Sequence, residues 1–112
     1  MSPLSTSPPS CLVYKVFLPE QFEVFCAQGA FGGSPDDLRD GFIHLSFAAQ
    51  LRKTISKHFA GRADLRIAEF QSEHLAPLLR FEFSRDEQLF PHLYDVLRWD
   101  LMLRCVPLDE VG

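Results

Sequence analysis

The sequence predicts a single α+β domain, and three observations lead to this expectation. The chain has 112 residues, which is enough for one hydrophobic core and too few for two. Hydrophobic residues make up 46% of the chain and charged residues 23%, as in an ordinary globular protein. Segments with strand and helix patterns are mixed along the chain, but the helical crossovers are too few for a regular doubly wound sheet.

The two ends of the chain differ in composition. Residues 1–10, MSPLSTSPPS, lack the charged start and apolar middle of a signal peptide. Their Ser/Pro-rich composition predicts a disordered tail. Residues 11–112 form the predicted domain. The three cysteines, Cys11, Cys26 and Cys105, are an odd number without a C-x-x-C pair, which is typical of a reduced, cytoplasmic protein. Cys26 and Cys105 stand among apolar residues and are predicted to be buried.

The first predicted elements are a strand and a helix. Residues 12–17, LVYKVF, have the β-branched and aromatic content of a strand. Residues 18–29 predict a helix, with Pro19 in the first turn and Gly29 just past the end. The apolar face of this helix is predicted to hold Phe22, Phe25 and Cys26. Residues 32–41, GGSPDDLRDG, contain turn residues throughout and are interpreted as a loop.

The second half repeats the mixture. Residues 47–61 predict a helix because apolar residues recur every four positions, at Phe47, Leu51, Ile55 and Phe59. The segments that follow are predicted to be a strand at 64–70, a turn or short helix at 72–79, a strand at 79–84, a loop at 85–95 and a last strand at 99–108.

The run FIHLS, residues 42–46, places a histidine inside a predicted strand. Alternation sends Ile43 and Leu45 to a core face, and His44 and Ser46 to the opposite face together with Phe42. An imidazole beside a hydroxyl can bind a polar ligand through hydrogen bonds. Two alternatives stay open, because His44 could be a buried histidine satisfied by backbone groups and Ser46 could cap the following helix.

The run FPHLY, residues 90–94, has a second histidine among apolar neighbours. Pro91 is predicted to hold this loop extended, so that His92 and Tyr94 project the same way. The alternative is an aromatic turn that packs on the core.

Several classes of function are excluded or disfavoured. Eleven Lys and Arg against fifteen Asp and Glu give a net charge of −4, without the basic run that tracks an extended nucleic acid. No apolar stretch is long enough to span a membrane. No two of the four histidines have the spacing of a metal-binding pair, and the chain has no phosphate-binding loop motif or G-x-S-x-G. No metal is therefore expected.

These segments together resemble a known family. VYKVF, PEQFEVF, GAFGGSPDDLRDGFIHLS, AAQLRKTISKHFAGRADLRI and SRDEQLFPHLYDVL, in this order, are similar to the DUF952 family, a domain of unknown function. The resemblance covers about residues 12–107. That family is similar to the ADP-ribosyltransferase fold and to the tRNA 2'-phosphotransferases. The resemblance implies a compact split β-sheet with two main helices and a cleft that takes NAD.

The resemblance also implies roles for single residues. His44 and Ser46 would lie in the cleft, where Ser46 binds the substrate, and the FPHLY loop would close over it. His92 and Tyr94 on that loop are expected to act with His44 as catalytic or stacking groups. Lys15 and Arg85 are expected to bind phosphate. Arg85 is chosen from its position in the sequence, because it follows a predicted strand just before FPHLY, and a solvated arginine is the alternative.

Two functions of different classes follow from the sequence. The leading hypothesis is an NAD- or nucleotide-processing enzyme of the ADP-ribosyl-transfer type, with NAD as the substrate. The alternative is a non-catalytic binding module for a nucleotide, an ADP-ribosylated group or a small phosphorylated metabolite. A structural or interaction domain, with His44 satisfied in the core, is a third hypothesis. The enzyme and the binding module are both expected to take a small-molecule or nucleotide ligand.

Overall fold

The computed structural model describes residues 11–84 and 87–107. They form a single α+β domain built from small antiparallel sheets and short helices. The strands are β1 (Leu12–Phe17), β2 (Ala30–Phe31), β3 (Ile43–His44), β4 (Arg66–Gln71), β5 (Leu79–Phe83), β6 (Leu89–Leu93), β7 (Leu97–Arg98) and β8 (Arg104–Val106). The α-helices are α1 (Pro19–Gln28), α2 (Pro35–Asp40), α3 (Leu51–His58) and α4 (Ser72–Leu75). Single 3₁₀ turns lie at Ala48–Gln50 and Trp99–Leu101.

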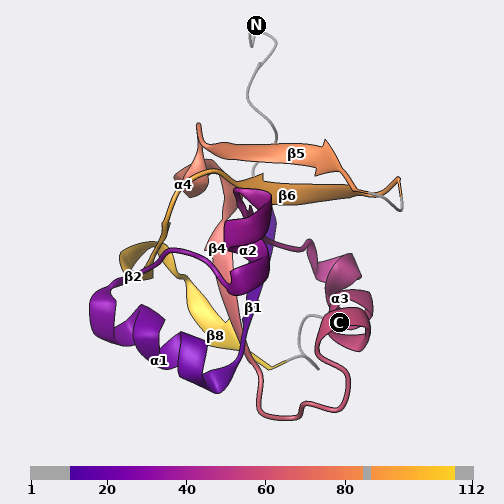
Figure 1. Ribbon diagram of the computed structural model, residues 1–112. Helices are drawn as coiled ribbons and strands as arrows, with labels where there is room; N and C mark the ends of the chain where they lie inside the picture. Colours follow the sequence, from indigo (N-terminus) through magenta and orange to yellow (C-terminus); the bar gives the residue numbers. More distant parts are fainter. Residues whose placement is uncertain (1–10, 85–86, 108–112) are drawn as a thin grey trace, which may run out of the picture.

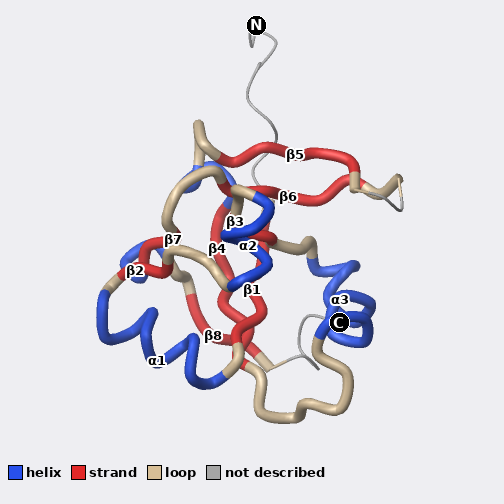
Figure 2. Tube along the Cα trace, in the orientation of Figure 1, coloured by secondary structure: helices blue, strands red, loops and turns tan. Residues whose placement is uncertain are grey.

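Two three-stranded sheets form the frame of the domain. One has the order β1-β4-β8 and the other has the order β3-β6-β5, with every neighbouring pair antiparallel. Figure 1 shows the β5–β6 hairpin across the top of the view, with α1 and α3 on opposite sides below it. The short pair β2-β7 adds a third sheet near α1 (Figure 2).

The two large sheets meet at Ser46. Its backbone N–H donates to the Tyr14 carbonyl at 2.9 Å, and the Tyr14 N–H donates to the Ser46 carbonyl at 2.8 Å. One residue earlier, the Leu45 N–H still donates to the Pro91 carbonyl in β6. The segment that follows β3 therefore passes from one sheet to the other within two residues, and His44 and Ser46 stand at this junction.

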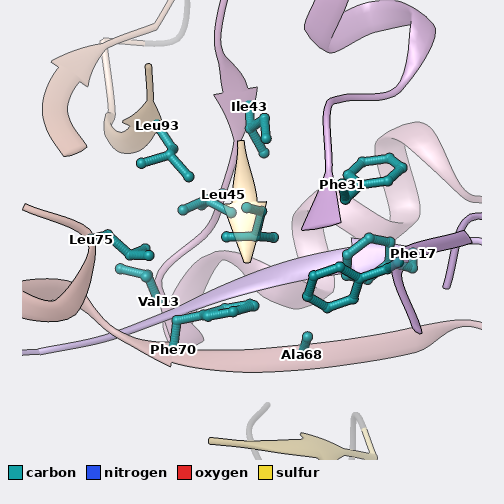
Figure 3. Close-up of a cluster of buried hydrophobic side chains, with 11 residues drawn as sticks. Val13, Phe17, Phe31, Ile43, Leu45, Ala68, Phe70, Leu75 and Leu93 are labelled. Carbon is teal, nitrogen blue, oxygen red and sulfur yellow. The ribbon is translucent and has the colours of Figure 1, made fainter. Parts of the chain in front are cut away.

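The main core lies between these sheets. Val13 and Phe70 of the β1-β4-β8 sheet face Leu45 and Leu93, whereas Phe17 lies against Phe31, as Figure 3 shows. Phenylalanine rings dominate the part beside α1, where Phe17 stacks on Phe25 with ring centroids 5.0 Å apart. A smaller cluster on the other face of β1 and β4 buries Leu51 of α3. This second cluster anchors α3 against the sheet.

The structure confirms several predicted elements. The strand at 12–17, the helix ending at Gly29 and the strand at 79–84 are present within a residue or two. The predicted strand at 64–70 is β4, and the short helix at 72–79 is α4. Phe47, Leu51, Ile55 and Phe59 are all buried or half-buried, as their periodic spacing predicted.

Three assignments were wrong. The loop expected at 32–41 contains α2, because Ser34 caps the helix, Pro35 begins it and Gly41 ends it at a φ of 86°. The FPHLY segment is not a closing loop, because β6 pairs with both β3 and β5 in the centre of its sheet. The last strand covers only Arg104–Val106, since Trp99–Leu101 form a 3₁₀ turn.

The burial predicted for two cysteines was also wrong, since Cys26 and Cys105 are both exposed. Phe25 is the buried residue of α1, and the next position, turned by about 100° around the axis, already faces solvent. Cys105 lies on β8, at the edge of its sheet, and Val106 takes the buried position there. The tail predicted at residues 1–10 lies outside the described residues.

The described helices include none that is long and apolar enough to cross a membrane.

Candidate functional site

Asp37 is the buried centre of a polar network between α2 and β3. Its carboxylate is 2% exposed. Oδ2 accepts from the Ser34 N–H at 2.9 Å and from the Lys15 ammonium at 3.0 Å. Oδ1 accepts from the backbone N–H of His44 at 3.1 Å and lies 2.6 Å from its ring Nδ1. Four donors converge on one carboxylate, which fixes the geometry of His44.

Burial and charge act in opposite directions on this network. Burial raises the pKa of Asp37, but the hydrogen bond from His44 and the charge of Lys15 outweigh it, so the pKa lies well below its ordinary value. Burial also lowers the pKa of Lys15, against the opposing effect of Asp37. An ionised Asp37 can only accept hydrogen bonds, and the proton on the His44 ring edge therefore sits on Nδ1.

His44 lies between two carboxylates. Its Nε2 is 2.9 Å from Oδ2 of Asp40, at the last position of α2, while Nδ1 faces Asp37. The His44 side chain is 39% exposed and the Asp40 side chain 34% exposed, whereas Asp37 is enclosed. The Asp37 edge of the ring is thus fixed, and the Asp40 edge is open to exchange with a ligand.

A second histidine–carboxylate pair lies beside the first. His92 is directly opposite His44 in the β3–β6 register, and the two ring centroids are 5.8 Å apart. Nδ1 of His92 lies 2.9 Å from Oε1 of Glu82, which also accepts the Tyr94 hydroxyl at 2.7 Å. Phe42 stacks on the His92 ring at 3.9 Å. The Glu82 hydrogen bond, followed by burial, raises the pKa of Tyr94.

A cleft of about 240 Å³ opens in front of His44. Its walls come from α2, β1, the β3–Ser46 segment, α3 and β6, together with Ser84 and Gln88 between β5 and β6. Carboxylates of α2 line one side, including Asp36, Asp37 and Asp40. Lys53 and Lys57 of α3 line another side. Ser46 is buried at the base, and its hydroxyl lies 3.1 Å from the Thr54 hydroxyl.

The structure brings most of the predicted site residues together. His44, Ser46, His92 and Lys15 all line this one cleft. Tyr94 contacts Glu82 behind His92, and it projects to the same side as His92, as predicted. The Lys15 ammonium is bound to Asp37 and to the His44 carbonyl, at 3.0 and 3.2 Å. Arg85 lies outside the described residues.

Sequence reasoning missed the carboxylates of the site. Asp37, Asp40 and Glu82 were not among the candidates. The signal for Asp37 was the S-P-D-D run, because serine followed by proline starts a helix and sets the fourth residue of the run in its first turn. In the described part of the chain, no group of three or more His, Cys, Asp and Glu side chains is arranged to hold a metal ion.

Comparisons with known proteins found one family model and three solved structures of one bacterial protein. The family model described as "Protein of unknown function (DUF952)" matches residues 17–105. The crystal structure of protein CC0527 from Caulobacter crescentus is similar to this chain, with a TM-score of 0.81 and 40% identity over 85% of this chain and 83% of the other. A double mutant of the same bacterial protein gives a TM-score of 0.80 at 39% identity, over 85% and 83% of the two chains. Its solution structure gives 0.76 at 40%, over 85% and 82%. No curated protein matches the chain.

Proposed function

The chain belongs to the DUF952 family, and from that premise we propose that it is an NAD- or nucleotide-processing enzyme of the ADP-ribosyl-transfer type. The reaction takes place in the cleft in front of His44, and NAD is the substrate. One observation carries the proposal: the His44 ring has a buried carboxylate 2.6 Å from Nδ1 and turns its other edge toward the cleft. A histidine oriented in this way is suited to take up or release a proton at Nε2.

The chemistry needs little more than orientation and one proton acceptor. The bond between nicotinamide and the ribose C1' breaks, and its electron pair leaves with nicotinamide. An acceptor oxygen then bonds to C1' and gives up its proton. A ligand hydroxyl first displaces the exposed Asp40 carboxylate, and the proton that Nε2 donates to that carboxylate leaves to solvent. The free Nε2 then receives the proton of the acceptor oxygen. Asp37 stabilises the imidazolium that forms.

The remaining residues hold the substrate. The buried Ser46 hydroxyl, supported by Thr54, offers a hydrogen bond to a ribose hydroxyl. His92, oriented by Glu82 and Tyr94, forms the second polar wall. Lys15 contributes positive charge through Asp37 rather than by direct contact with phosphate. A direct phosphate contact is kept as the proposed role of Arg85.

The arrangement of the two large sheets supports the same reaction class. They are joined at Tyr14 and Ser46, and the cleft is lined by residues on both sides of this junction. A split sheet with its ligand at the junction is the architecture expected of an ADP-ribosylation-like fold. We include that fold relationship in the proposal.

Nicotinamide release from NAD tests the proposal. The wild-type protein should release nicotinamide, and His44→Ala should lower the rate about a hundredfold or more. His74→Ala is the matched control, since His74 is an exposed histidine outside the cleft. Equal rates for wild type and His44→Ala would overturn the assignment of His44, and no release by the wild type with a range of acceptors would overturn the enzyme itself.

A second candidate is a binding module that keeps the cleft without catalysis. It is favoured by the complete pairing of the network, in which the Lys15 ammonium and both ring nitrogens of His44 already have partners. A ligand can bind beside such a network through hydrogen bonds alone, without any proton transfer. Thermal stabilisation by NAD or ADP-ribose without nicotinamide release would favour this function over the enzyme.

A further inference from the structure

The lysines of this protein are concentrated at one place. The chain has three, Lys15, Lys53 and Lys57, and all three line the cleft. Among the described arginines, Arg39 alone lines it, and that side chain is paired with Asp36 and Asp40. Lys15 is buried against Asp37. Lys53 and Lys57 of α3 supply the other two ammonium groups of the cleft lining.

The stability of α3 explains the charge of Lys57 but not that of Lys53. The segment Leu51–His58 carries Arg52, Lys53 and Lys57 but no Asp or Glu, in a chain with a net charge of −4. Lys57 and His58 at the C-terminal end suit the helix dipole. Lys53 stands in the first turn, where a positive charge gains nothing from the dipole, and no described residue pairs with its ammonium.

Hydroxyl groups lie beside the lysines. Lys53, Thr54 and Lys57 occupy the cleft-facing side of α3. Thr54 and Ser46 share one hydrogen bond at 3.1 Å, so one of their two hydroxyl protons remains available to a further acceptor. Two ammonium groups four residues apart, with a hydroxyl donor between them, match the several oxygens of a phosphate or pyrophosphate.

We propose that the α3 side of the cleft binds the pyrophosphate of a nucleotide through Lys53 and Lys57. The carboxylates of α2 lie on the other side, and they repel the phosphates and attract the cationic nicotinamide ribose. This charge difference orients the nucleotide so that its sugar meets His44. The orientation rests on the proposed function, whereas the phosphate site itself does not depend on turnover.

Lysine footprinting with inorganic pyrophosphate tests the phosphate site directly. Amine acetylation followed by mass spectrometry reports each of the three lysines separately. Pyrophosphate should slow the modification of Lys53 and Lys57, and adenosine without a phosphate should not. Unchanged modification of both lysines at saturating pyrophosphate and ADP would overturn the site.

Charge-removing variants separate this site from the reaction. Lys53→Gln and Lys57→Gln should each weaken pyrophosphate binding about tenfold in calorimetry. Arg52→Gln, the same charge change on the same helix outside the cleft lining, should leave it within about twofold. Pyrophosphate binding without nicotinamide release would keep the site and reject the enzyme. Nicotinamide release with an unchanged KM for NAD in Lys53→Gln and Lys57→Gln would reject the site and keep the enzyme.

Discussion

Asp37 and His44 form the closest polar contact of the site, with 2.6 Å between Oδ1 and Nδ1. The contact joins α2, a helix of six residues, to β3, a strand of two residues, and both elements are too short to be stable without tertiary contacts. Asp37 also neutralises Lys15, so the same carboxylate orients the candidate catalytic ring and compensates a buried cation. Stability and function are therefore coupled at this residue.

Asp37→Asn should lower the free energy of unfolding by about 3 kcal/mol, because it leaves the buried Lys15 ammonium without its counter-charge. Urea unfolding measures this loss. The double variant Lys15→Met/Asp37→Leu removes both charges and should be more stable than Asp37→Asn alone. A loss below about 0.5 kcal/mol for Asp37→Asn would contradict the ion pair.

Acid should destabilise the protein through the same carboxylate. The pKa of Asp37 is lower in the folded protein than in the unfolded chain, where it is about 4. The stabilisation is complete above that unfolded value and is lost as the pH falls below it toward the folded pKa. The unfolding free energy should therefore fall steeply below about pH 4, and less steeply in Asp37→Asn. Equal slopes for the two proteins would contradict this.

His44→Ala should separate function from stability. The ring is partly exposed, and after its removal Asp37 still accepts from Lys15 and two backbone N–H groups. We expect a loss of about 1 kcal/mol in urea unfolding, together with loss of nicotinamide release or of nucleotide binding. Residual function that merely follows the folded fraction would instead make His44 a structural residue.

Both tyrosines should ionise at a higher pH than an ordinary tyrosine, each because of its own carboxylate partner. Burial, followed by the hydrogen bond to Glu69, raises the pKa of Tyr14 to about 12. The hydrogen bond to Glu82 raises that of Tyr94. In a Tyr14→Phe background, Glu82→Gln should shift the tyrosinate absorbance titration to lower pH. An unchanged titration would show that Glu82 does not accept a hydrogen bond from the Tyr94 hydroxyl in solution.

Thiol labelling tests the corrected cysteine positions. Cys26 and Cys105 are exposed and should react quickly with a thiol reagent in the native protein. Cys11 is half-buried, with Sγ 3.5 Å from the Ser72 hydroxyl, and should react more slowly. Mass spectrometry after brief labelling identifies the modified residues. Slow reaction of Cys26 would mean that α1 presents a different face to the core.

Elements with a regular apolar pattern could be predicted from the sequence. The strand at 12–17 was correct because β-branched and aromatic residues favour a strand. The helix stripe at 47–59 was correct because four-residue spacing marks the buried face. The α2 helix was missed because it lacks an apolar stripe and buries an aspartate instead. FPHLY was interpreted as a loop that Pro91 holds extended, yet Pro91 lies in the central strand β6. Proline has no N–H to donate, and Pro91 takes part in the sheet through its carbonyl, which accepts from the Leu45 N–H.

The histidines of the candidate site could be predicted from the sequence, but their carboxylate partners could not. His44 and His92 stand out in sequence because each interrupts an apolar run, and the structure places them opposite each other. Asp37 and Glu82 do not stand out, because carboxylates are common in exposed segments and only tertiary contacts distinguish these two. The pairing of each histidine with its carboxylate depends on the fold.

The junction at Tyr14 and Ser46 has a consequence for local opening of the domain. Two backbone hydrogen bonds join the β1-β4-β8 sheet to the segment that carries His44 and Ser46. A fluctuation that breaks this pair exposes both amides to solvent and loosens the floor of the cleft without disrupting either sheet ladder. Deuterium uptake at these amides therefore reports the opening of the site. A ligand that bridges the sheets would slow that exchange before it changed the melting of the whole domain.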